Sequence, residues 1–308
     1  AACQNDENPS QPEPKPRQDI NLTRAEQEFM DKGTDFAFRF FDQVCSTEKE
    51  KPNVFVSPLS ASLCLSMITN GATDNTLAEM QDVLGFPANT FSLDDLNNYN
   101  QKLTSALLDL DNTTQLGIAN SIWIEEGFKV YDSFVDVNKK MYDAQVQELD
   151  FTSPTAKDVI NQWCATQTNN CIKEVIQEIP ADARMYLINA LYFKGIWKSQ
   201  FDKSATGQDN FTNVDGSQQK VAMMNQTATF NYTQTDDFSI AELPYGNEAF
   251  SMVILLPSGD KTLDESLPSL NYENWKQWSK NMVGKELQIK LPRFKVEYDK
   301  ELEEDMIA

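Results

Sequence analysis

The feature that most restricts the fold is a stretch that is apolar on both faces for most of its length, residues 184–197 (RMYLINALYFKGIW). Neighbouring side chains of a strand point to opposite faces, so apolar residues at odd and even positions both need a cover. The stretch therefore predicts a strand in the middle of a sheet that is covered on both sides. The chain must supply the helices and strands that provide this cover.

Periodicity and capping residues predict those other elements. Helices are predicted over residues 23–44, 57–70, 77–84, 92–107, 130–142, 155–167 and 263–281. Strands are predicted over residues 53–56, 115–124, 146–151, 184–197, 221–229, 239–243, 250–256 and 287–298. In the last strand the alternation changes phase at Pro292, where we expect a β-bulge. No repeat and no boundary is visible after residue 28, which predicts one α+β domain over residues 29–308.

Residues 1–28 differ from the rest and are predicted to form a flexible, Pro-rich tail. Residues 3–20 are polar and rich in proline, so they cannot bury enough apolar surface to offset the entropy lost on ordering. Two alanines precede Cys3, as in bacterial lipoproteins, where a cysteine after small residues is lipidated following cleavage. We therefore expect a secreted or cell-envelope protein, with a lipid on Cys3 as its membrane contact. The alternative is a chance cysteine beside an unrelated cleavage site.

The composition excludes several functional classes. The chain has no histidine, which excludes Ser-His-Asp and Cys-His nucleophiles and histidine-based zinc sites. Ser-x-x-Lys occurs three times where about one or two matches are expected by chance, and no Lys-Thr-Gly or Ser-Asp-Asn motif accompanies it. No glycine-rich phosphate loop is present. A formal net charge of -21 repels polyanions, so nucleic acid is not an expected partner. We expect a protein that is not an enzyme and that uses no metal and no cofactor.

The remaining cysteines are predicted to be free thiols. They are Cys45, Cys64, Cys164 and Cys171, and none forms the Cys-x-x-Cys pair of redox or zinc-ribbon sites. Cys164 and Cys171 are separated by roughly 10 Å on an unbroken helix, which is too far for a disulfide. A bridge between these two residues would require the helix to end between them.

Three polar residues are unusual for a core. Asn189 is a single amide in the centre of the two-sided apolar strand, and Ser57 and Ser60 lie at the start of an otherwise apolar helix. A buried polar group without a partner costs about 1–3 kcal/mol. The serines can be explained as helix caps, but Asn is disfavoured in the middle of a strand. We therefore expect Asn189 to be buried and hydrogen-bonded to the region of Ser57 and Ser60.

Four short motifs carry a family resemblance. They occur at residues 53–60 (NVFVSPLS), 189–197 (NALYFKGIW), 221–224 (VAMM) and 291–294 (LPRF). In this order, and with the intervening pattern of helices and strands, they resemble the landmarks of the serpin family. The resemblance covers roughly residues 29–308.

The resemblance implies the serpin fold, in which helices pack on three β-sheets. In inhibitory serpins a protease cleaves an exposed reactive loop, which inserts as a new strand into the large sheet while the protease is trapped as an acyl-enzyme. By resemblance, Ser57, Ser60 and Asn189 match the shutter, the cluster beneath the point where the strands part. Trp197 matches the breach, where the loop first inserts. The implied partner is a serine or cysteine protease.

The sequence also departs from the family pattern. After residues 291–294 and the start of a helix, no counterpart of the inserting strand, the reactive loop or the final core strands is found, so no reactive bond lies in this chain. We expect a fragment, a truncated product, or a domain completed by a second chain that supplies the C-terminal segment. Three functions stay open: a protease inhibitor, a non-inhibitory serpin that binds or carries a ligand, and a surface-tethered binding protein.

Overall fold

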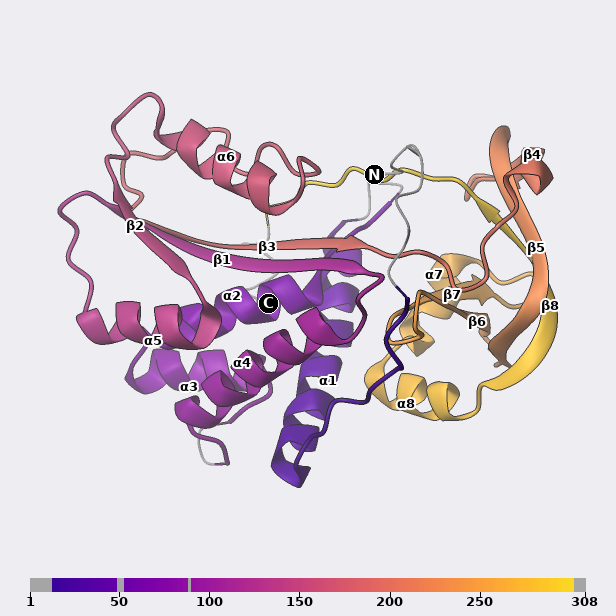
Figure 1. The fold of residues 1–308 in the computed structure, drawn as a ribbon, viewed down its shortest axis with the longest axis horizontal. Coiled ribbons are helices and arrows are strands. Elements are labelled where there is room, and N and C mark those ends of the chain that lie inside the picture. Colours follow the sequence, from indigo (N-terminus) through magenta and orange to yellow (C-terminus); the bar gives the residue numbers. More distant parts are fainter. Residues whose placement is uncertain (1–12, 49–52, 88–89, 302–308) are drawn as a thin grey trace.

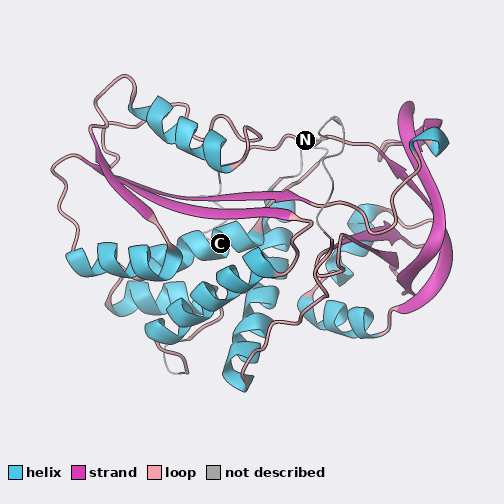
Figure 2. Cartoon of the chain, in the orientation of Figure 1, coloured by secondary structure: helices cyan, strands magenta, loops and turns pink. Residues whose placement is uncertain are grey.

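The structure is a computed structural model that describes residues 13–48, 53–87 and 90–301. Two sheets lie side by side, and most of the helices gather around the first (Figures 1 and 2). The helices are α1 (Arg24–Thr47), α2 (Pro58–Thr69), α3 (Asp74–Val83), α4 (Leu93–Asp109), α5 (Asp132–Tyr142), α6 (Ala156–Gln167), α7 (Leu263–Ser266) and α8 (Tyr272–Lys280). The strands are β1 (Gln115–Glu125), β2 (Gln145–Leu149), β3 (Met185–Lys194), β4 (Gly207–Thr212), β5 (Gln218–Gln234), β6 (Phe238–Pro244), β7 (Ser251–Pro257) and β8 (Val283–Pro292).

The first sheet has the strand order β2-β1-β3. β1 pairs in parallel with β2 and antiparallel with β3, in a register that places Asn120 opposite Asn189. Both faces of β3 are covered as predicted, by α2 on one side and α6 on the other (Figure 1). Its position in the sheet differs from the prediction. Within the described part of the chain, β3 is an edge strand that pairs with β1 alone.

Two apolar clusters cover the two faces of this sheet. On one face, Ile122 and Ile124 of β1 pack with Leu63 and Met67 of α2. On the opposite face, a second cluster contains Trp123, Ile160, Trp163 and Ala190. The alternation of side chains along β1 therefore fixes which helix lies on which face.

Three helices begin at the capping residues that the sequence predicts, whereas α3 begins at Asp74, before the predicted residues 77–84. Thr23 and Ser92 form capping boxes with Glu26 and Asp95, and Ser57 caps α2 with Pro58 in the first turn. α3 ends before Gly85, whose φ of +79° is in the left-handed region that glycine adopts without strain.

An aromatic cluster between the helices anchors α1. The ring centroid of Phe29 lies 4.4 Å from that of Phe91, 4.8 Å from that of Phe86 and 5.1 Å from that of Tyr99. All four rings are buried. They hold α1 against α4 and the segment that follows α3.

The second sheet is organised by β5, a strand of 17 residues. β5 pairs with β4 near its start, with β8 along its middle and with β6 near its end, and β6 pairs with β7. Phe238 of β6 packs against Trp278 of α8 beneath this sheet.

Several predicted elements differ in the structure. The helix expected over residues 263–281 is interrupted after Ser266, because Pro268 cannot continue an α-helix. Residues 53–56 form no strand with any described residue, although Val54 and Val56 pack against the α1 cluster. β8 ends at Pro292, and no strand follows it up to residue 301.

Other differences concern whole elements. β4 was missed because most of its side chains are exposed and polar, so it has no apolar alternation. The described residues form two sheets, whereas the serpin resemblance implies three.

The tail prediction is modified by the contacts of residues 13–23. The backbone N–H of Lys15 donates to Asn112 Oδ1 at 2.8 Å, and Lys15 Nζ pairs with Asp109 at 2.7 Å. Residues 24–28 belong to α1 and not to the tail. Cys3 lies outside the described residues, so its lipidation stays a prediction. No helix among the described residues is both long and apolar enough to cross a membrane.

The free thiols are confirmed for the described cysteines. Cys45, Cys64, Cys164 and Cys171 form no disulfide with one another. Cys164 belongs to α6, which ends at Gln167, and Cys171 follows in the turn after it.

We predict that an ion pair between α1 and α8 stabilises the protein only above acid pH. Lys276 Nζ lies 3.1 Å from Asp31 Oδ2. Partial burial raises the pKa of Asp31, but its hydrogen bonds, chiefly that from Lys276, outweigh this effect and lower it. The stabilisation is therefore present above the unfolded-state pKa and is lost as pH falls through the folded-state pKa.

The test compares urea unfolding of Asp31→Asn and wild type at pH 7 and in acid. The variant should unfold at lower urea at pH 7, and the difference should vanish in acid. An equal difference at both pH values would contradict the prediction. Asp94→Asn, on the exposed start of α4, is the control.

Candidate functional site

A chain of amides begins at the centre of the first sheet with Asn189, which is half-buried and not fully buried as predicted. Asn189 Nδ2 donates to Asn120 Oδ1 at 2.8 Å across the β1–β3 pair, and Asn120 Nδ2 donates to the carbonyl of Tyr142 at 2.7 Å. Asn120 is 4% exposed. The two cross-strand amides thus connect the sheet to the last residue of α5.

The chain continues from Tyr142 into the helices. The hydroxyl of Tyr142 donates to Asn97 Oδ1 at 2.7 Å and accepts from Asn100 Nδ2 at 3.3 Å. Asn97 and Asn70 exchange hydrogen bonds of 2.8 and 3.1 Å. Burial raises the pKa of Tyr142 to about 12, so its hydroxyl keeps its proton at neutral pH. Side chains or backbone groups of β3, β1, α5, α4 and α2 are joined in one polar network.

Two oxygens near this network have no hydrogen-bond partner among the described residues. Asn138 Oδ1 and Asn189 Oδ1 are both buried, while the Nδ2 atoms of the same side chains do donate. A buried acceptor without a donor is costly. Asn189 Oδ1 belongs to the edge strand β3, so a donor from a segment added beside β3 could satisfy it.

Ser57 and Ser60 begin α2, and among the described residues neither is hydrogen-bonded to Asn189. Ser57 Oγ accepts from the backbone N–H of Ser60 at 3.3 Å and donates to Ser60 Oγ at 3.0 Å. Along the same helix, Cys64 hydrogen-bonds to the backbone of Asn189, and burial raises the pKa of its thiol to about 11. The expected direct bond between Asn189 and the serines is therefore wrong. The partner is Asn120, and α2 contacts Asn189 one turn beyond Ser60.

At the end of β3, Trp197 joins the two sheets. Its ring stacks on that of Tyr245 with centroids 4.3 Å apart and packs edge-on against Phe201 at 6.0 Å. Trp197 and Tyr245 also form a β-bridge. A Cβ on Gly195 would lie 2.7 Å from the ring of Tyr245, so only glycine permits this close approach.

Most of the network was missed by the sequence interpretation. Asn120 carried a signal, because it interrupts the apolar alternation of β1 just as Asn189 interrupts that of β3. Asn97 and Asn100 gave none, since amides are common on exposed helix faces. The described residues contain no group of three His, Cys, Asp or Glu side chains that could hold a metal.

Comparison with known proteins decides the family. The model of the family Serpin (serine protease inhibitor) matches residues 31–308. The chain belongs to the serpin family.

Individual relatives agree with this assignment. An uncharacterized serpin-like protein of Methanosarcina acetivorans is 33% identical over 279 residues, which are 88% of this chain and 65% of that protein. Human Serpin B3 is 30% identical, over 89% of this chain and 75% of its own length. The native-state crystal structure of the thermophilic serpin Tengpin superposes with a TM-score of 0.84 at 30% identity, covering 96% of this chain and 73% of Tengpin. This serpin chain thus spans about two thirds to three quarters of the length of these relatives.

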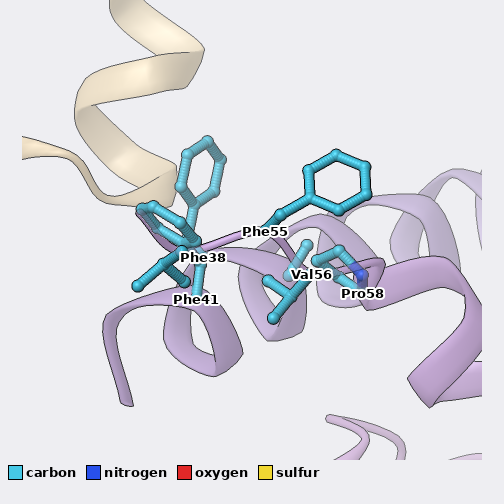
Figure 3. Close-up of a pocket in the computed structure, with 7 residues that line it drawn as sticks. Phe38, Phe41, Phe55, Val56 and Pro58 are labelled. Atoms are coloured by element: carbon cyan, nitrogen blue, oxygen red, sulfur yellow. The ribbon is translucent and has the colours of Figure 1, made fainter. Parts of the chain in front are cut away.

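This serpin also exposes an apolar groove of about 310 Å³. In Figure 3 the ring of Phe55 stands to one side of the groove and those of Phe38 and Phe41 of α1 stand to the other. Val54, Val56, Ala37 and Pro58 complete its lining. Phe55 is 67% exposed. An exposed apolar patch of this kind is typical of a surface that contacts another chain segment.

We predict that Asn120 contributes more to stability than Asn189. Asn120→Ala leaves both Asn189 Nδ2 and the Tyr142 carbonyl without partners, and should lower the free energy of unfolding by about 1–3 kcal/mol. Asn189→Ala leaves only Asn120 Oδ1 without its partner, so it should lower the free energy of unfolding by less. Urea unfolding of both variants tests this, with the exposed Asn210→Ala as control. A larger loss for Asn189→Ala than for Asn120→Ala would refute the prediction.

Proposed function

We propose that this serpin inhibits a serine or cysteine protease by cleavage of a reactive loop, which then inserts as a strand beside β3. The observation that carries the proposal is the free edge of β3 within the described residues, with the unpartnered Asn189 Oδ1 at its centre. The membership of a family described as serine protease inhibitors supports it.

The energetics of the free edge favour insertion. A new strand would pair with the open N–H and C=O groups of β3 and would lie between the covering layers of α2 and α6. A hydrogen-bond donor on that strand would also remove the cost of the buried Asn189 Oδ1. Cleavage of the loop frees its end to reach this position, so insertion should be favourable only after the cut.

The proposed roles of the named residues follow from the serpin motifs to which they belong. Ser57, Ser60 and Asn189 act as the shutter, in which polar groups beneath the sheet exchange partners as the strands separate. Trp197 marks the breach at the end of β3, where insertion begins. In this proposal the scissile bond and the reactive loop belong to a segment outside the 308 residues, either in the same chain or in a second one.

The alternatives concern the same fold. A non-inhibitory serpin would bind or carry a ligand without inserting its loop. The hinge, the part of that segment where the loop joins the inserting strand, decides between the two, because small residues there permit insertion. For localisation we propose a secreted or surface-tethered protein with the lipid on Cys3, as the sequence of the tail suggests.

We predict that the 308-residue chain alone inhibits no protease. Extended by its natural C-terminal segment, it should form a covalent complex with at least one protease of a panel of serine and cysteine proteases. Denaturing gels detect the complex. The loop-cleaved form should also melt at a higher temperature, because insertion adds a complete ladder of hydrogen bonds.

A variant of the extended protein with proline in the hinge of the loop is the matched control. It should be cut as a substrate without trapping the protease, because proline cannot donate to the ladder. The absence of any complex together with an unchanged melting temperature would overturn the inhibitory proposal in favour of the non-inhibitory one.

We also predict that the 308-residue chain self-associates. The free edge of β3 and the groove around Phe55 leave backbone groups and apolar surface open to a second copy. Phe55→Ser should weaken association, measured by light scattering over a range of concentrations. Val214→Ser removes an even more exposed apolar side chain, in the β4–β5 turn, and is the control. A monomeric wild type at high concentration would show the prediction to be wrong.

A further inference from the structure

Asp111 is the only charged side chain among the buried residues of the described ranges, with 4% exposure. It lies in the turn between α4 and β1. Burial raises the pKa of Asp111, but hydrogen bonds from Thr113, Thr114 and Asn247 outweigh this effect and hold it below its ordinary value. The protein therefore keeps a buried carboxylate that none of the proposed functional roles uses.

The contacts of Asp111 join two distant turns. Its Oδ1 accepts from the backbone N–H and the hydroxyl of Thr113 at 2.8 and 2.7 Å, and its Oδ2 accepts from the hydroxyl of Thr114 at 2.8 Å. The backbone N–H of Asn247, in the turn between β6 and β7, donates to Oδ2 at 3.4 Å. Asn247 Nδ2 returns a bond to the carbonyl of Leu110 at 2.8 Å.

Gly246 shows how closely the two turns fit. Its φ is +39°, and a Cβ at this position would lie 2.2 Å from both Asp111 Oδ2 and the hydroxyl of Thr113. The backbone at Gly246 therefore rests directly on the carboxylate. Only glycine can occupy such a position.

The same β6–β7 turn holds the end of β3. The backbone N–H of Gly246 donates to the carbonyl of Ile196 at 2.8 Å, and that of Lys198 donates to the carbonyl of Pro244 at 3.0 Å. Tyr245, next to Gly246, is the residue that stacks on Trp197. Because Gln115 of β1 pairs with Lys194 of β3, the three segments meet at one end of the first sheet.

We propose that Asp111 is a positioning residue that fixes residues 195–198 at the end of β3 through the β6–β7 turn. The functional consequence rests on the proposed function: Asp111 holds the breach at Trp197 in place while the first residues of the loop pair with β3. Without the carboxylate, the turn and the end of β3 separate more often, and the loop inserts more slowly.

The first experiment does not depend on inhibition. Hydrogen exchange of the full-length protein is compared between wild type, Asp111→Asn and Ser92→Ala. Asp111→Asn keeps the size of the side chain but removes its charge, whereas Ser92→Ala removes the cap at the opposite end of α4. In Asp111→Asn, the amides of Gly246 and Lys198 should exchange about tenfold faster, as expected for the loss of hydrogen bonds to a buried charge.

Ser92→Ala should leave these two amides unchanged, although it destabilises α4. No acceleration in Asp111→Asn, or an equal acceleration in both variants, would overturn the positioning role. The first result would show that Asp111 does not hold these amides, and the second that it affects only the global stability.

The second experiment tests the functional consequence with a protease that the wild type traps. Asp111→Asn should associate with the protease at the wild-type rate, because the loop is not altered. Its stoichiometry of inhibition should rise several-fold, because slower insertion lets more acyl-enzyme hydrolyse. Ser92→Ala should change neither value.

The outcomes separate the two proposals. If the wild type traps no protease, the proposed function fails. The exchange rates alone then confirm or overturn the role of Asp111 in positioning the end of β3. If exchange accelerates but the stoichiometry stays at the wild-type value, the proposed role of Asp111 in loop insertion is overturned.

Discussion

The antiparallel pairing of β1 with β3 is the interaction on which the other layers of the molecule depend. It brings together strands that are separated by α5, β2 and α6 in the sequence, and its alternation creates the two apolar faces. α2 and α5 pack on one face and α6 packs on the other. A shift of one residue in the pairing would turn Trp123 and Ile122 to the wrong clusters, so the register determines the whole helical layer.

The polar residues within this core specify the register of the β1–β3 pair and do not destabilise the core. Asn189 donates to Asn120 in the register that places them directly opposite, and Tyr142 and the α4 amides extend that requirement to the helices. An apolar pair at the same positions would tolerate several registers. Asn189 Oδ1 is one of the two unpartnered oxygens near this network, and it belongs to β3, which is an edge strand among the described residues.

The sequence predicts local features well, because capping and alternation depend on neighbouring residues. Examples are the capping residues Thr23, Ser57 and Ser92, at which three helices begin, and the cover on both faces of β3. Asn189 could be recognised as unusual, but its partner could not, because the pairing with Asn120 depends on a register set by distant packing. Asp111 carried no signal in a chain with 47 acidic residues. The break of the last long helix was readable from Pro268, whereas β4 has no apolar pattern to detect.

The groove beside Phe55 makes the association of two copies of the chain sensitive to salt. Each copy of the chain carries a formal charge of -21, so two copies repel one another before their apolar surfaces can touch. At low ionic strength this repulsion extends over tens of ångströms and slows every encounter, but in physiological salt it is screened beyond about 8 Å. The predicted self-association should therefore depend on the electrolyte as much as on the fold, and it should be slowest in dilute buffer.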